Sequence, residues 1–67
     1  MFIKIGKLRI KLSSIGEFRE GGFAQSNSKW YIEIKVSGRN RLIYFDTEEE
    51  YNRIVVYLDK TLKIIEV

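Results

Sequence analysis

Most cationic side chains of this sequence gather in two stretches whose chemistry suits phosphate groups. One stretch is KIGKLRIK, residues 4–11, and the other is KVSGRNR, residues 35–41. Lysine and arginine donate charge-assisted hydrogen bonds to phosphate oxygens, and tyrosine rings can stack on nucleobases. The sequence therefore predicts a site for the backbone of DNA or RNA. Its expected residues are Lys4, Lys7, Arg9, Lys11, Lys35, Arg39, Arg41, Tyr31 and Tyr44.

The spacing of the first stretch adds a physical argument for an anionic partner. If the chain turns at Gly6-Lys7, Lys4 lies directly across from Arg9. Like charges in that position destabilise a strand pair, and a bound phosphate would relieve their repulsion. The alternative is that these cations form a solvated strand edge that prevents aggregation between sheets.

A second candidate surface is apolar and predicts a protein partner instead. The outer face of residues 29–46 carries two tyrosines and a leucine, with Glu33 in the middle. A carboxylate at that place argues against a phosphate chain as the partner and favours a protein. Tyrosine is also a typical anchor residue of protein interfaces. The alternative function is a protein-binding or inhibitor domain, for example of a mobile element, or a homodimer. Its expected interface residues are Phe23, Tyr31, Leu42 and Tyr44.

The sequence favours a binding module over an enzyme. It contains no histidine and no cysteine, which excludes a serine or cysteine nucleophile with a histidine base and argues against a zinc site. Asp46 and the acidic run Glu48-Glu49-Glu50 suit the first turn of a helix, where carboxylates complement the helix dipole. The glycines lie in no phosphate-cradling motif. We therefore expect no catalytic residue, no metal and no cofactor.

Size and composition indicate one small globular domain covering residues 1–67. A chain this short buries only about 60% of its unfolded surface, and there are no disulfides to support it. Isoleucine, valine and aromatic residues supply most of the apolar fraction, which favours strands. No apolar run is long enough to cross a membrane, and the lack of cysteine fits a cytoplasmic protein.

The first part of the chain reads as a hairpin followed by a bend. Residues 1–12 alternate between apolar and polar side chains, and Gly6-Lys7 fits a two-residue type II′ turn. Strand structure is expected to continue to about residue 19, with a bulge or corner near Gly16. Residues 20–28 are rich in Gly, Ser, Asn and Gln and are expected to form a loop, with Phe23 folded back onto the core.

The middle of the chain predicts a second hairpin, from strands at 29–36 and 41–46. The number of loop residues decides which side chains are buried, because a slip of one residue exchanges the faces. An even loop is favoured, since Gly38-Arg39 repeats the order of Gly6-Lys7. The buried face then consists of Trp30, Ile32, Ile34, Val36, Ile43 and Phe45.

The end of the chain predicts a helix from about Glu48 to Leu62. Thr47-Glu48-Glu49-Glu50 matches a capping box, and apolar residues from Tyr51 onward recur at helical spacing. Residues 63–67 have no stop signal. The expected fold is α+β: a twisted antiparallel sheet of four or five strands, either open or curled into an incomplete barrel, with one C-terminal helix.

Overall fold

The computed structural model describes residues 1–62 of the chain. The prediction for residues 63–67 lies outside this range. The elements are β1 (Phe2–Ile5), β2 (Leu8–Lys11), a 3-10 turn (Leu12–Ser14), β3 (Ile15–Ala24), β4 (Lys29–Val36), β5 (Arg39–Phe45) and α1 (Glu48–Thr61). The fold is therefore α+β, with antiparallel strands and a C-terminal helix as the sequence predicted.

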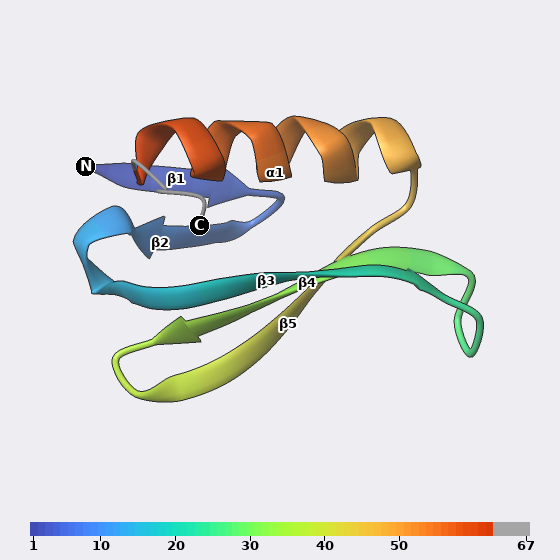
Figure 1. The fold of residues 1–67 in the computed structure, drawn as a ribbon, viewed down its shortest axis with the longest axis horizontal. Coiled ribbons are helices and arrows are strands. Elements are labelled where there is room, and N and C mark those ends of the chain that lie inside the picture. Colours follow the sequence, from blue (N-terminus) through green and yellow to red (C-terminus); the bar gives the residue numbers. More distant parts are fainter. Residues whose placement is uncertain (63–67) are drawn as a thin grey trace, which may run out of the picture.

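The strands form two sheets that pack through side chains. β1 and β2 make a two-stranded sheet, and β3, β4 and β5 make a three-stranded sheet in that order. No strand pairing joins the two sheets within residues 1–62, so the strands do not close into a barrel. The β1–β2 hairpin and α1 lie together on one side of the three-stranded sheet (Figure 1). The molecule is thus built in two layers around one core.

The core receives side chains from both sheets and from the helix. Its central strand, β4, supplies the fully buried Ile32 and Ile34, and α1 supplies Leu58. The complete buried set is Ile3, Ile10, Leu12, Ile32, Ile34, Ile43, Phe45, Tyr51, Val55 and Leu58. Because no hydrogen-bonded strand pair within residues 1–62 links the two sheets, this apolar cluster is what holds them together.

The first hairpin has the predicted register. Ile5 pairs with Leu8, Ile3 with Ile10, and Lys4 with Arg9. Gly6 has a φ of +61°, which a type II′ turn requires at its first position and which glycine adopts without steric cost. The register places the hairpin's isoleucines in the core and its cations on the opposite side.

The second hairpin has the predicted even loop, but the reason for it differs. The turn is Ser37-Gly38, with φ values of 51° and 82°, and Val36 pairs with Arg39. Two positive φ values define a type I′ turn, so Gly38 occupies the second turn position rather than the first. Consequently β5 begins at Arg39, two residues earlier than predicted. The parity, and with it the predicted buried face, is confirmed: Ile32, Ile34, Ile43 and Phe45 are buried, and Trp30 and Val36 pack against them.

The predicted loop at 20–28 is wrong in most of its length. β3 continues to Ala24, and only residues 25–28 form the turn into β4. A register shift between Glu20 and Gly22 absorbs an extra residue, and Gly22 adopts a φ of +86° there. Glycine and serine signalled a loop, but pairing with a distant strand overrode that local preference. Phe23 packs edge-on against Trp30, with the two ring centroids 5.4 Å apart, yet it stays half exposed. It is therefore only partly folded back onto the core.

The helix begins where the capping box predicted and ends one residue early. The Thr47 hydroxyl oxygen accepts a hydrogen bond from the Glu50 amide at 3.2 Å. Tyr51, Val55 and Leu58 form its buried stripe. Within residues 1–62, no helix has the length and apolar character needed to cross a membrane.

Tyr51 links α1 to β3 and gives the fold a sensitivity to alkali. Its hydroxyl donates to Glu20 Oε1 at 3.5 Å, and burial raises the pKa of the phenol above 10.0. A raised folded-state pKa means that this contribution to stability is complete below pH 10 and is lost as the pH rises further. In urea unfolding between pH 9 and 11, the native chain should therefore lose stability more steeply than Tyr51→Phe. Tyr57→Phe, at a more exposed tyrosine of the same helix, is the control and should follow the native curve.

Candidate nucleic-acid interface

The outer face of the β1–β2 hairpin carries cations with no acidic neighbour in sequence. The core-facing positions are three isoleucines and Leu8. The alternate positions therefore point away from the core and are exposed: Phe2, Lys4, Arg9 and Lys11. Since Ile5 and Leu8 close the two-residue turn, Lys4 and Arg9 form a non-hydrogen-bonded pair, in which side chains come closer together. The first acidic residue of the chain is Glu17. The predicted like-charge pair is therefore present, and nothing on the hairpin neutralises it.

The start of β5 adds two cations beside this hairpin. One hollow of about 390 Å³ is lined by β2 and by the beginning of β5. Arg9 and Lys11 line it from one side, and Arg39 and Arg41 line it from the other. Leu8, Ile10 and Val36 are its apolar lining, and no carboxylate of residues 1–62 contributes to it. We call this the basic hollow. Its size lies at the lower end of the range for small-ligand sites.

A second hollow continues along β5 toward the start of α1. Lys4 and Lys7 line it together with Asp46, Glu50 and Arg53. Both carboxylates already have partners: Asp46 accepts from Lys29 at 2.8 Å, and Glu50 accepts from the Thr47 hydroxyl at 3.2 Å. The hydrogen bond and the charge of Lys29 lower the pKa of Asp46. The Asp46 carboxylate therefore ties the end of β5 to Lys29, and the Glu50 carboxylate belongs to the N-terminal cap of α1.

The cations of the hairpin and of the β5 start make no ion pair within residues 1–62. The cations that do form one are Arg19, Lys29 and Arg53. We define the basic surface as Lys4, Lys7, Arg9, Lys11, Arg39 and Arg41. Unpaired exposed cations contribute little to folding, so the basic surface is free to engage an anion.

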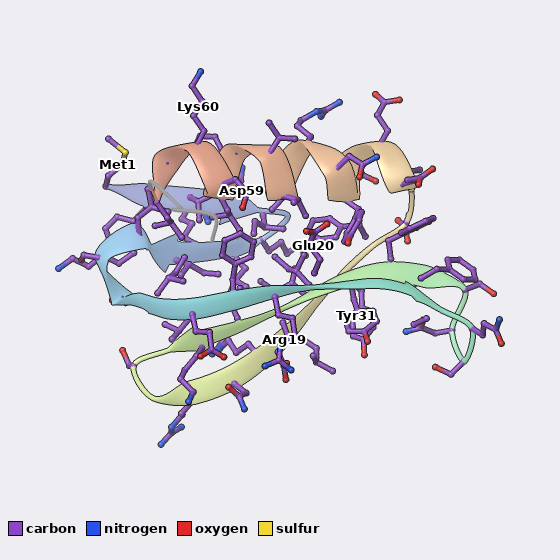
Figure 2. All side chains as sticks on the ribbon, in the orientation of Figure 1. Met1, Arg19, Glu20, Tyr31, Asp59 and Lys60 are labelled. Atoms are coloured by element: carbon purple, nitrogen blue, oxygen red, sulfur yellow. The ribbon has the colours of Figure 1, made fainter. Side chains whose placement is uncertain are left out.

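The predicted stacking residues lie on the opposite side of the molecule. Tyr31 pairs with Tyr44 across β4 and β5, and their ring centroids are 5.8 Å apart. Both occupy the face of the three-stranded sheet that points away from the core. Figure 2 shows Tyr31 and Arg19 on this outer side, while Glu20 points toward α1. Tyr31 lines neither hollow that the basic surface lines, whereas Tyr44 at the edge of the sheet lines the second hollow together with Lys4 and Lys7.

Lys35 also belongs to the tyrosine side. It pairs with Glu17 and lines a shallow hollow with Arg19 and Glu33. Arg19 lies 3.7 Å from both Glu17 and Glu33, so the charges of this face largely cancel. Lys35 therefore lies apart from the other cations predicted to contact phosphates, between Glu17 and Glu33.

The outer face has a feature that the sequence reading missed. Gly21 lies beneath the ring of Tyr31, and a Cβ at Gly21 would overlap that ring. Leu42, half exposed, continues the apolar surface beside Tyr44. We call Tyr31, Leu42 and Tyr44 the tyrosine face. Gly21 lies under Tyr31 because of the bulged pairing of β3 with β4, and no local sequence pattern indicates that contact.

Comparison with known proteins adds no relative from which a role could be carried to these residues. No protein-family model, curated protein or solved structure matches the chain at a significant level.

Proposed function

We propose that this chain is a small, non-enzymatic module that binds the phosphate backbone of nucleic acids through its basic surface. The observation that carries the proposal is the basic hollow. Two cations from β2 and two from β5 converge on it, without a carboxylate in its lining and without an ion pair in residues 1–62. Folding gains nothing from assembling like charges, whereas a polyanion gains several contacts at once.

Binding of this kind is expected to depend on salt and to read little sequence. Contacts to phosphates fix a nucleic acid in place, while base edges carry the sequence information. The exposed ends of lysine and arginine suit phosphates more than any one base. A cytoplasmic location, expected from the lack of cysteine, belongs to the same proposal.

The first test removes the β5 side of the basic hollow. The double variant Arg39→Ser/Arg41→Ser should bind a fluorescein-labelled single-stranded oligonucleotide more weakly than the native chain. Two lost contacts reduce the slope of log K against log salt by about 1.4, which corresponds to roughly 25-fold at 0.1 M salt if the affinities converge at 1 M. Fluorescence anisotropy across a salt series measures both quantities.

The matched control removes the same net charge elsewhere. Arg19→Ser/Lys60→Ser takes one cation from the tyrosine side and one from the exposed end of α1. Its affinity and salt slope should stay close to those of the native chain. An equal loss in both double variants would mean that net charge alone attracts the polyanion. No binding of single- or double-stranded DNA or RNA by the native chain at low salt would refute the proposed function.

A protein partner at the tyrosine face is the second candidate. It is favoured by the exposed apolar surface of Tyr44 and Leu42 beside charges that cancel one another. Removing water from such a surface costs little free energy, and tyrosine is a frequent anchor residue of protein interfaces. A homodimer through this face would double the mass measured by sedimentation. Tyr44→Ser should abolish the dimer and return the mass to that of one chain. Under this candidate, removal of the basic hollow would leave partner binding unchanged.

A further inference from the structure

The side chain of Phe2 is placed where a ligand could use it and where the fold does not. It lies on the outer face of β1, pairs with Lys11 and is 63% exposed. The apolar side of the hairpin is provided by its isoleucines and Leu8, which are buried or packed on the core. None of the aromatic contacts within residues 1–62 involves Phe2. More than half of this side chain is therefore accessible to a planar group.

The cations around Phe2 would hold a phosphate next to that ring. Phe2 and Lys11 form a non-hydrogen-bonded pair, like Lys4 and Arg9, so the opposing side chains are close. Along β1, Phe2 and Lys4 share a face and are separated by two residues, about 6.7 Å. In a nucleotide the base is joined to its own phosphate through one sugar. A single nucleotide can thus contact the cation pair and the ring together.

We propose that Phe2 stacks on an unpaired base, so that the basic surface prefers single-stranded nucleic acid to a duplex. This inference rests on the proposed function and names the ligand class of the same surface. In a duplex the bases are paired and stacked, so a base must be unpaired and unstacked before it can contact Phe2, which costs free energy. An unpaired base of a single strand needs no such opening of base pairs. Stacking on an aromatic side chain depends on the base plane, so it tolerates any base sequence.

The test separates the base from the phosphate by changing the probe. The probes are a labelled oligothymidylate of ten nucleotides, an abasic phosphodiester chain of the same length, and a DNA duplex. Phe2→Ala should weaken binding of the oligothymidylate by between about 5-fold and 150-fold, the loss expected for one stacked base. It should leave the abasic chain and the duplex unchanged. Phe2→Trp should retain native affinity for the oligothymidylate, because indole also stacks.

The matched control is Val56→Ala on α1, whose side chain is 64% exposed, almost the same as that of Phe2. It should bind every probe like the native chain. Equal losses of Phe2→Ala on the oligothymidylate and the abasic chain, or no loss on either, would overturn the stacking role while phosphate binding stands. Failure of the native chain to bind any probe would overturn the proposed function and this inference with it.

Discussion

Replacing Leu58 with alanine is expected to remove a large part of the protein's free energy of unfolding. Leu58 is 1% exposed and lies in the cluster that joins both sheets to α1. Truncating such a leucine costs about 2–5 kcal/mol, because the cavity left behind only partly collapses. At roughly 0.05–0.15 kcal/mol per residue, a chain of 67 residues has a total stability of only about 3–10 kcal/mol. The substitution therefore removes much of it.

The measurement is thermal unfolding followed by circular dichroism. A loss of 1 kcal/mol lowers the Tm of a domain this small by about 4–8 °C, so Leu58→Ala should lower it by at least about 8 °C. Val56→Ala, two residues earlier on the exposed side of the same helix, should shift it by less than about 4 °C. Similar Tm changes in both variants would contradict the placement of α1 against the three-stranded sheet.

This dependence on α1 follows from how the strands are connected. The two-stranded and the three-stranded sheet share no strand pair in residues 1–62. Each sheet alone has one apolar face and too few strands to bury it. The helix and the hairpin cover the inner face of the three-stranded sheet together, so loss of the helix would expose Ile32 and Ile34 to water. The basic surface depends on the same packing, because it combines β2 with β5.

The parts of the fold that were predicted correctly are those determined by neighbouring residues. Thr47 and Glu50 lie three residues apart, so the helix start could be recognised locally. Gly6 sets the first turn. The even loop between β4 and β5 was also predicted correctly, but from the likeness of Gly38-Arg39 to Gly6-Lys7, whereas the turn is Ser37-Gly38. The extension of β3 to Ala24 could not be recognised in this way. It depends on pairing with β4, on a bulge at Gly22 and on space above Gly21 for Tyr31.

The same distinction applies to the candidate site: what neighbouring residues determine could be predicted, and what tertiary packing determines could not. That Lys4 opposes Arg9 was predictable, because a two-residue turn fixes their register. That Arg39 and Arg41 would lie beside Arg9 was not, because it depends on how the hairpin packs over the three-stranded sheet. The parity of β4 already separated Lys35 and Tyr31 from the buried face, but only the packing shows that the hairpin cations lie on the other side of the core.

Reversing the charge of Lys4 should raise stability and lower affinity at the same time. In the native chain Lys4 faces Arg9 in a closely spaced pair of like charge. Glutamate at this position converts repulsion into attraction, and cross-strand charge pairs are worth about 0.2–1 kcal/mol. Lys4→Glu should therefore raise the Tm by up to about 8 °C. The same change removes one phosphate contact, so affinity for a single-stranded oligonucleotide should fall at least about fivefold at 0.1 M salt.

The opposite signs of the two effects are what distinguish a binding surface from a solvated strand edge. Lys60→Glu is the control, since it makes the same change in net charge at the exposed end of α1. It should leave affinity nearly unchanged and lower stability slightly, because a carboxylate near the helix C-terminus opposes the dipole. If Lys4→Glu raised the Tm but kept native affinity, the hairpin cations would be solvated charges and the polyanion would bind elsewhere. Under the proposed function, an anion bound between Lys4 and Arg9 would offset the cost of their repulsion to folding.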